Sequence, residues 1–541
     1  MPLQKDLYTD DDPSYARTRL NSGIPPPSLR DRRQDSHDRP HHHQQQYQQH
    51  QQGRRRDENL SGWNPATQRP SHRQESYHPY PQQQRQSYNS GGQTIPNQAN
   101  PSSFRPSHNS SSGYPPRDQY RDERHIEERP REERPRETRH QEPQRQREER
   151  PKAQHAKVDL RTSTDFLVCE DPSKKLSIDQ ITANIRASGI KDKDDDFISS
   201  AELIQKANAL RETIRQAPAE PRSTARARSN PFESIGKSIF MNRAATKLAA
   251  LDATFSLSST SDNKPLVFAD LCGGPGGFTE YLLWRVCSGG GNAHGYGITL
   301  KMPDETDELN WQTGKFRSDA PLNFTIIDGP DGSGNLYHEA NILGFGSKIM
   351  SETSNQGVDL VVADGGFDFT GKEEHQENYA QRLLLCEAIT MLTCLKKGGT
   401  YVCKFFDMNE EFTADLVWLL YQLFEMVCIT KPLTSRPANS ERYLVCKQLR
   451  FQQPTGLINA LMRVQNMMEH KPVMSFVKAA VLTEDEEFFD YVKMRNFKML
   501  LKQINSLTQL DLHLKDPQRP LQFDQEAIRR QCLAEWRLPL R

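Results

Sequence analysis

A dense glycine turn follows directly after a short apolar run near the middle of the chain. The run 266–271 carries Asp270 near its end, four of the next six residues are glycine, and a helical pattern begins near Thr279. A strand, a glycine turn and the start of a helix bring backbone amides and a helix N-terminus close to a ligand. The stretch therefore predicts a nucleoside-binding loop, the alternative being a glycine turn without a ligand. The residues of this predicted loop are Asp270, Cys272, Gly273, Gly274, Pro275, Gly276, Gly277 and Phe278.

The spacing of these glycines does not favour a nicotinamide cofactor. The dinucleotide pattern GxGxxG is absent, because Thr279 stands where its last glycine would be. Asp270 is placed to accept a hydrogen bond from the ammonium group of a methionine moiety. An acid that would hold a ribose after the second strand is missing, because residues 299–301 read Thr-Leu-Lys there. Asp328 and Asn335, after the third strand, are the candidates for that role.

Apolar strand-like runs alternate with helical runs from residue 239 onward. The strand-like runs are 266–271, 295–300, 324–327, 358–363, 401–406, 428–433 and 443–446, and the helical runs are 279–287, 379–395 and 416–427. Strands that are almost entirely apolar and separated by helices predict a parallel sheet buried on both faces. The predicted fold class is therefore α/β, doubly wound and Rossmann-like, with helical N- and C-terminal extensions.

Composition divides the chain into four parts. Residues 1–160 are rich in Gln, Arg, His, Pro and Ser with few aliphatic side chains, which predicts a long disordered low-complexity tail. Residues 161–235 are predicted to form a helical and basic accessory segment, and 236–450 the α/β domain. Residues 451–541 read as a helical extension without new strands, with helical patterns at 457–468, 488–504 and 525–536.

Charge and cysteine content exclude several classes of protein. The formal net charge is zero, which argues against indiscriminate coating of nucleic acid and leaves a local patch as the form of any RNA contact. The nine cysteines form no CxxC pair, so neither a disulfide framework nor a zinc site is expected. We expect Cys386, Cys394, Cys403, Cys428 and Cys446 to be small core residues. We also expect no membrane segment or signal peptide, and an intracellular protein.

An acid and a lysine follow or occupy two neighbouring predicted strands. Asp364 comes directly after the strand 358–363, and Lys404 lies inside the apolar strand 401–406. A buried lysine is unfavourable unless it is paired, so Lys404 is the most informative single residue, its alternative being a lysine that snorkels from the strand end. Lys247 and Glu441 come from flanking segments, and either alone would read as a solvated surface residue.

These four residues together would suit methyl transfer to a ribose hydroxyl. A 2'-hydroxyl is a weak nucleophile, so the reaction benefits from a positioned base and from stabilisation of the developing alkoxide. Partial burial and a second cation would lower the pKa of Lys404 so that it accepts the proton, while Lys247 stabilises negative charge. Asp364 and Glu441 would orient the two amines, and no metal is required.

The tetrad of Lys247, Asp364, Lys404 and Glu441, with the glycine loop 272–278, resembles the K-D-K-E tetrad and donor motif of the RrmJ/FtsJ 2'-O-methyltransferases. Within that family, the matching segments are similar to those of the cap-specific mRNA enzymes of the cap 1 type. These segments are 242–245, 272–278, 363–367 and 435–443. The resemblance covers roughly 222–450, and four separated motifs in the right order make coincidence improbable.

The resemblance implies S-adenosylmethionine-dependent methylation of the ribose 2'-O of the first transcribed nucleotide of 5'-capped mRNA, in the nucleus. It implies donor contacts at Asn242, Asn335 and Leu336, and RNA contacts at Arg226, Glu374 and Asn439. The partners implied are capped mRNA and the transcription or capping machinery. We expect neither the G-patch segment nor the guanylyltransferase-like and WW modules of the animal enzymes, and therefore no recruitment through a WW module.

A local basic patch fits this reading. Residues 222–247 hold six cations and one acid, Glu233, which suits the triphosphate and backbone of a capped 5' end, although a solvated charge run is the alternative. Pro218 and Pro221 are expected to break the helical pattern just before it. The cations of this patch are Arg222, Arg226, Arg228, Lys237, Arg243 and Lys247.

Three other functions remain open from the sequence. A 2'-O-methyltransferase acting on rRNA or tRNA would carry the same tetrad, and so would an enzyme for the second transcribed nucleotide (cap 2). A non-catalytic RNA-binding scaffold would be expected to lack a member of the tetrad, and all four are present. Stacking of an aromatic ring on the cationic cap base is expected on physical grounds, but no ring is singled out.

Overall fold

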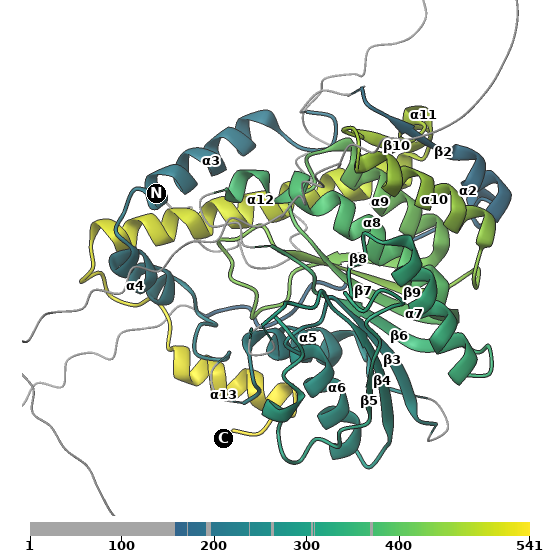
Figure 1. The fold of residues 1–541 in the computed structure, drawn as a ribbon. Helices are drawn as coiled ribbons and strands as arrows, with labels where there is room; N and C mark the ends of the chain where they lie inside the picture. The colour runs from purple at the N-terminus through teal and green to yellow at the C-terminus, as the bar shows by residue number, and fades with distance from the viewer. Residues whose placement is uncertain are drawn as a thin grey trace, which may run out of the picture. The chain divides into compact units, whose positions relative to one another are not determined.

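The fold is known from a computed structural model. It describes residues 157–169, 171–190, 196–236, 239–260, 264–304, 307, 309–367 and 372–540. Nearly all of the predicted disordered tail, 1–160, and the patch residue Lys237 lie outside these described residues. The described part of the chain is an α/β structure with one large sheet and helices on both of its faces (Figure 1).

The large sheet has eight strands in the order β1-β8-β9-β7-β6-β3-β4-β5. Their bounds are β1 (Phe166–Val168), β3 (Leu266–Leu271), β4 (Ala293–Ile298), β5 (Phe324–Ile326), β6 (Val358–Ala363), β7 (Leu395–Phe405), β8 (Phe424–Thr430) and β9 (Arg442–Leu449). Strands β7, β6, β3, β4 and β5 pair in parallel. Strands β9, β8 and β1 pair antiparallel.

The prediction of a wholly parallel sheet was therefore wrong for one side of the sheet. The connection between β8 and β9, residues 431–441, contains no helix. A parallel crossover needs a dozen or more residues and usually a helix, so a strand that returns after this connection pairs antiparallel with its predecessor. This connection, which we call the β8–β9 connection, carries Glu441 at its end.

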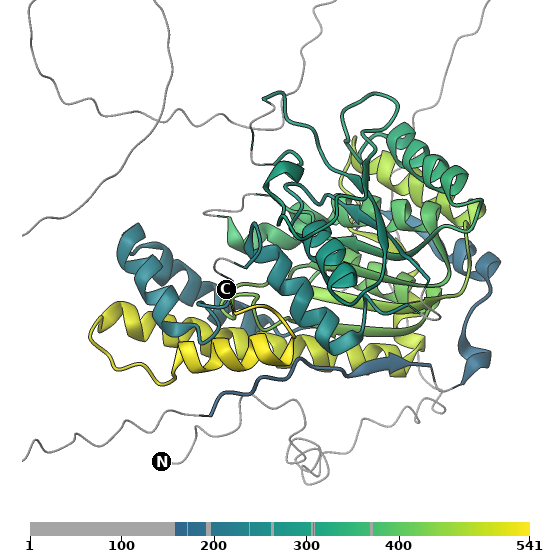
Figure 2. The same cartoon turned by 90° about the horizontal axis from the view of Figure 1, so that it is seen from below.

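Two layers of helices cover the sheet (Figures 1 and 2). On one face lie α7 (Glu339–Glu352), α8 (Gln376–Cys394), α9 (Glu411–Leu423) and α10 (Thr455–Met468). On the other lie α5 (Arg243–Phe255), α6 (Gly277–Ser288) and α13 (Gln525–Glu535). Alternate residues of each strand enter opposite cores: Val361 packs into the first, and Leu360 and Val362 pack into the second. This alternation explains why the strands are apolar on both faces.

A long helix, α12 (Glu486–Lys515), packs beside two helices from the start of the described chain. These are α3 (Ala201–Arg215) and α4 (Ala219–Ser229), which share a small apolar cluster with α12 (Figure 1). The expected break in the helical pattern is confirmed at Pro218, which lies between α3 and α4, and is wrong for Pro221. Pro218 is the N-cap residue of α4, and Pro221 lies in its first turn, where a backbone N–H has no partner within the helix.

The C-terminal extension contains a strand that the sequence did not predict. Strand β10 (Ser475–Val477) pairs antiparallel with β2 (Ile185–Ser188) in a separate two-stranded sheet. The carboxylate of Asp415 accepts hydrogen bonds from the backbone N–H groups of Phe476 and Val477, so contacts with distant residues fix this strand. The predicted helices of the extension are confirmed by α10, α12 and α13. The remaining elements are η1 (Pro172–Lys174), α2 (Ile178–Asn184), η2 (Thr313–Lys315), η3 (Glu373–His375) and α11 (Ala479–Glu484).

The predicted core positions of five cysteines are confirmed. All nine lie in described residues and are free thiols, and the five that we expected in the core are buried. In the part of the chain that the structure covers, no group of three or more His, Cys, Asp or Glu side chains is arranged to hold a metal ion. Among the same residues, no helix is long and apolar enough to cross a membrane.

Candidate active site

The sheet order brings the four residues of the tetrad to one edge. Asp364 directly follows β6, Lys404 is near the end of β7, and Glu441 directly precedes β9. Because β9, β7 and β6 are neighbours in the sheet, these three side chains converge without any long loop. Lys247 reaches them from the second turn of α5.

The carboxylate of Asp364 bridges the two amines. Its Oδ1 lies 3.1 Å from Nζ of Lys404, and its Oδ2 lies 3.5 Å from Nζ of Lys247. Lys404 also donates a hydrogen bond to the backbone carbonyl of Asp364 at 2.7 Å. Lys247 donates to Oε2 of Glu441 at 2.7 Å. Each of the four side chains keeps only 10–14% of its surface exposed, so the charges are paired in a site that is largely closed to water.

Mutual attraction fixes the charge of the outer pair. Burial alone would lower the pKa of Lys247, but the carboxylates of Asp364 and Glu441 outweigh it and raise that pKa. Burial likewise opposes ionisation of Glu441, yet Lys247, Lys404 and Lys431 lower its pKa to about 2. At neutral pH, Lys247 is therefore a cation held by an anionic Glu441.

Tyr443 completes the cluster and was not predicted from the sequence. Its hydroxyl donates a hydrogen bond at 2.6 Å to Oδ1 of Asp364, and Tyr443 lies opposite Lys404 in the β7–β9 register. A signal for it was present in the sequence. Glu441 and Tyr443 are two positions apart at the start of one strand, so their side chains point to the same face.

The predicted donor loop lies at the same edge of the sheet, between β3 and α6. Oδ2 of Asp270 accepts hydrogen bonds from the backbone N–H and the hydroxyl of Thr279, at 3.1 and 2.7 Å. Asp270 thus ties the loop to the first turn of α6, and it is wholly buried. Its Oδ1 has no hydrogen-bond partner within the described chain. Burial raises the pKa of Asp270 to about 7, against the opposing effect of the Thr279 hydrogen bonds.

Close packing explains why the loop needs glycine. Gly276 has a φ of +118°, which other residues rarely adopt, and a Cβ atom there would lie 2.6 Å from the ring of Phe316. At Gly277 a Cβ atom would lie 2.1 Å from Oδ1 of Asn242. Asn242, the N-cap residue of α5, therefore lies directly against the start of α6.

Two further loops surround the donor loop. The segment 309–316 lies across it, with Gln312 donating a backbone hydrogen bond to the carbonyl of Pro275 at 3.0 Å. The segment 328–336 packs on the end of β4, since a Cβ atom on Gly334 would lie 1.8 Å from the carbonyl oxygen of Thr299. It carries the predicted donor residues Asn335 and Leu336. No pattern in the sequence indicated that the segment 309–316 lies beside the loop.

The two ribose candidates are engaged in different ways. Oδ2 of Asp328 lies 3.3 Å from Nζ of Lys301, the residue that stands near the place of the missing acid. Asn335 accepts a hydrogen bond from the backbone N–H of Tyr337 at 3.0 Å, and its amide nitrogen lies 3.4 Å from Nε2 of His338. Leu336 is buried.

Comparison with known proteins identifies the domain. The model of the FtsJ-like methyltransferase family matches residues 240–449, the segment that holds the donor loop and all four tetrad residues. We call residues 240–449, which this family model matches, the FtsJ-like domain.

Curated relatives extend the similarity beyond this domain. The cap-specific mRNA (nucleoside-2'-O-)-methyltransferase 1 of Dictyostelium discoideum is 36% identical over 334 residues, covering 58% of this chain and 43% of that protein. The protein of the same name from Homo sapiens is 37% identical over 334 residues, covering 58% and 39%. The chain thus spans less than half the length of these relatives. A crystal structure of a Plasmodium falciparum ribosomal RNA methyltransferase is 22% identical, covers 38% of this chain and 97% of that chain, and has a TM-score of 0.28, too low for a conclusion.

The three RNA-contact candidates lie in different settings, with Arg226 before the FtsJ-like domain and Glu374 and Asn439 within it. Arg226 is on α4, where burial and the nearby Arg436 lower its pKa. Glu374 is ion-paired with Arg215 of α3 at 2.6 Å. Asn439 is exposed on the β8–β9 connection, and Lys431 donates hydrogen bonds to its backbone carbonyl and side-chain oxygens at 3.0 and 2.8 Å.

The basic patch 222–247 does not form one open surface. Arg243 donates two hydrogen bonds to the carbonyl of Thr434, at 3.0 and 2.8 Å, and pairs with Glu233 at 3.1 Å. Arg228 donates to the carbonyl of Arg519 at 2.6 Å. Lys247 belongs to the tetrad and is ion-paired there with Glu441. Some of the cationic side chains of this patch therefore make contacts within the protein and are not available to RNA.

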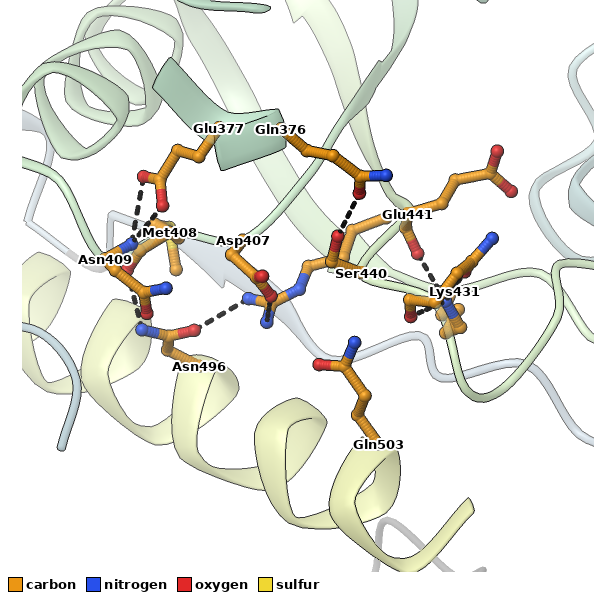
Figure 3. A network of polar contacts seen from close by, with 12 residues as sticks. Gln376, Glu377, Asp407, Met408, Asn409, Lys431, Ser440, Glu441, Asn496 and Gln503 are labelled. Atoms are coloured by element: carbon orange, nitrogen blue, oxygen red, sulfur yellow. Dashed lines mark hydrogen bonds and ion pairs between the residues drawn. The ribbon is translucent and has the colours of Figure 1, made fainter. Parts of the chain in front are cut away.

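A buried polar network that was not predicted from the sequence joins α12 to strand β9. Arg442, the first residue of β9, is 2% exposed and bonds Oδ1 of Asn496 at 2.7 Å and Oδ1 of Asp407 at 3.1 Å. Asp407 also pairs with Arg211 of α3 at 3.2 Å. Asp407 and Asn496 lie at one end of this network, and Lys431 and Glu441 lie at the other (Figure 3).

Proposed function

We propose that this chain transfers a methyl group from S-adenosylmethionine to the ribose 2'-O of the first transcribed nucleotide of 5'-capped mRNA, converting cap 0 to cap 1. The observation that carries the proposal is the bridging carboxylate of Asp364, which holds the amines of Lys404 and Lys247 on its two oxygens at the edge where the glycine loop ends. A pair of amines so held suits a hydroxyl acceptor.

The residues around the donor loop fit S-adenosylmethionine. Oδ1 of Asp270 is a buried carboxylate oxygen without a hydrogen-bond partner among the described residues, and it would be satisfied by the donor's ammonium group. Asn242, Asn335 and Leu336 lie on the segments that pack around the loop. When bound, this donor supplies a methyl group activated by its positively charged sulfur.

Lys404 is placed to take the proton from the 2'-hydroxyl. In its neutral form the amine has two N–H groups, and the two acceptors that it contacts, the backbone carbonyl and Oδ1 of Asp364, can use both of them. The lone pair is then left for the hydroxyl proton. Asp364 and the hydroxyl of Tyr443 orient this amine, since Tyr443 bonds the same carboxylate oxygen.

Lys247 has a different task. It is a permanent cation at neutral pH, held by Glu441, and it supplies positive charge where the 2'-oxygen becomes more negative during transfer. Electrostatic stabilisation of this kind needs no movement during the reaction, because the charge is already in place.

Capped mRNA is proposed as the substrate on the strength of the relatives. Cap-specific mRNA methyltransferases from Dictyostelium discoideum and Homo sapiens resemble the chain over 58% of its length, which extends beyond the family match. We propose further that the protein acts in the nucleus and that the transcription or capping machinery presents the RNA. Fluorescence microscopy of the tagged full chain tests the first point, and a cytoplasmic signal alone would contradict it.

The experiment that tests the substrate compares capped and uncapped transcripts of one sequence. We expect methyl transfer to the capped transcript only, and mass spectrometry of the digested product should place the methyl group on the ribose of the first transcribed nucleotide. Equal transfer to both transcripts would favour an rRNA or tRNA enzyme. A methyl group on the second nucleotide would assign the chain to cap 2.

A further inference from the structure

A pocket of about 120 Å³ lies between α12 and the β8–β9 connection, outside the cluster of the tetrad. Its walls also include Asp159, Arg161, Ser163 and Phe232. A single water needs only about 10–15 Å³ by this kind of measure, so the pocket has room for a larger ligand. Neither the donor loop nor any tetrad residue lines it.

Positive charge dominates the walls of this pocket. Six cationic side chains and one carboxylate, that of Asp159, line it among the described residues. Three of the cations come from one face of α12, because the lining residues of this helix recur every three or four positions. The six are Arg161, Lys431, Arg442, Arg495, Lys498 and Lys502; Arg442 is ion-paired with Asp407, and burial lowers the pKa of Lys431 to about 7.

Several buried polar atoms at the pocket have no hydrogen bond within the described chain. They are Oγ of Ser163, Oε1 of Gln503 and Nη1 of Arg495, the last of which has an ion pair with Asp165 at 3.6 Å. Gln503 and Arg495 are 3% and 2% exposed. Buried polar atoms in native proteins are nearly always bonded, so the two without any partner, Oγ of Ser163 and Oε1 of Gln503, indicate a polar ligand at this pocket.

The pocket also offers apolar surface. Phe232, Leu433 and Met499 line it beside the cations. A planar group with polar edges and a negative charge matches this combination. The apolar walls would contact its faces, the buried polar atoms would bond its edges, and the lysines would balance its charge. A nucleotide has all three features, and sites for single-stranded RNA combine the same elements.

The pocket adjoins the reaction centre. Lys431 lines it and donates a hydrogen bond at 2.6 Å to the backbone carbonyl of Glu441, whose side chain holds Lys247. Ser435 and Asn439, on the same β8–β9 connection, also line the pocket. Gln503 projects from α12 toward this connection (Figure 3). Its side chain donates a hydrogen bond to the carbonyl of Ala438 at 3.3 Å.

We infer that this pocket binds a nucleotide of the substrate RNA downstream of the methylated one. The inference rests on the proposed function for the identity of the substrate. It predicts that the enzyme prefers longer capped RNAs over a capped dinucleotide, because only the longer RNAs fill the pocket.

The test uses the full chain with Lys498→Glu and Lys502→Glu combined. The matched control is Lys471→Glu with Lys478→Glu, which changes the net charge equally at exposed lysines outside the pocket. Methylation is measured on a capped dinucleotide and on a capped RNA of about ten nucleotides. We expect the KM for the longer RNA to rise about tenfold in the pocket variant and to stay unchanged in the control.

Salt dependence gives a second measure. The slope of log KM against log salt for the longer RNA should fall by about one for each lysine that is reversed. A longer-RNA KM equal to that of the unmodified chain would overturn the inference. An equal rise on the dinucleotide would also overturn it, because the pocket would then act on the cap. Lys498→Gln with Lys502→Gln replaces the reversal if a lowered melting temperature shows that the glutamates disturb folding.

Failure of the proposed function can be distinguished from failure of the inference about the pocket. If the unmodified chain methylates no capped RNA, fluorescence anisotropy with the ten-nucleotide RNA still tests the pocket. A weaker affinity in the pocket variant than in the control supports the RNA site, and equal affinities contradict it.

Discussion

The amine of Lys404 lies 3.1 Å from the carboxylate of Asp364 and 2.7 Å from the backbone carbonyl of the same residue. One residue therefore fixes the amine from two directions, and a Cβ atom on the nearby Gly366 would lie 3.1 Å from it. The position of the lysine depends on the backbone after β6 as much as on the acid itself.

Removing the charge of Asp364 should slow the reaction without unfolding the protein. Asp364→Asn keeps the shape and the backbone carbonyl contact, but it removes the anion between two lysines. We expect kcat to fall by about a hundredfold or more while the affinity for the donor stays the same. Single-turnover assays and donor binding by calorimetry check this. A kcat within threefold of the unmodified value would contradict it.

Tyr443 should act as a positioning residue for Asp364. Tyr443→Phe removes the hydroxyl that bonds Oδ1, and Lys404 still contacts that oxygen. We expect a loss of about 1 kcal/mol in the free energy of unfolding and a lower kcat with an unchanged KM for RNA. A purely structural role for Tyr443 would leave kcat unaltered once the protein is folded.

Donor binding should depend on pH through Asp270. Burial raises the pKa of this carboxyl to about 7 without donor, and a bound ammonium group would lower it by favouring the anion. Binding therefore releases a proton below pH 7, so affinity should rise with pH toward 7 and level off above about pH 8. Calorimetry in buffers of different ionisation enthalpy measures the proton. Asp270→Asn should abolish the pH dependence, and proton uptake on binding would contradict the assignment.

Asp407 should be important for stability. Asp407→Ala leaves the guanidinium of Arg442, which is 2% exposed, without its carboxylate partner and also removes the partner of Arg211. Breaking a buried ion pair in this way costs about 3–5 kcal/mol. Urea unfolding measures the change, with Glu469→Ala as the control, because Glu469 is an exposed carboxylate paired with Arg382 and we expect its loss to cost less than about 1 kcal/mol. Equal losses of unfolding free energy in both variants would show that the buried ion pair contributes no more to stability than the exposed one.

Sequence periodicity predicts the core of the fold well. Strands such as 266–271 and 358–363 are apolar throughout because both faces are covered, and they lie where the pattern places them. The antiparallel side of the sheet and β10 escaped prediction. The direction in which two strands pair depends on the path of the chain between them. Strand β10 depends on the hydrogen bonds of its backbone with Asp415, which is 61 residues from Phe476.

Some residues of the candidate site could also be predicted from the sequence, and others could not. Asp364 and Lys404 were visible because a charge at the end of an apolar strand is unusual, and the sheet brings them to 3.1 Å. Tyr443 and Lys431 were not singled out, because a tyrosine or lysine near a strand end has many ordinary roles. The pairing of Glu374 with Arg215 joins segments more than 150 residues apart, and no local pattern indicates it.

Single-turnover methyl transfer by Lys404→Ala tests the central claim most directly, namely that the tetrad carries out transfer to a ribose hydroxyl. The measurement uses the full chain, capped RNA and saturating donor, with donor binding measured on the same preparation. We predict a rate lower by at least about a hundredfold with donor affinity retained, because the group that accepts the proton is gone. Transfer at the rate of the unmodified chain would contradict the account.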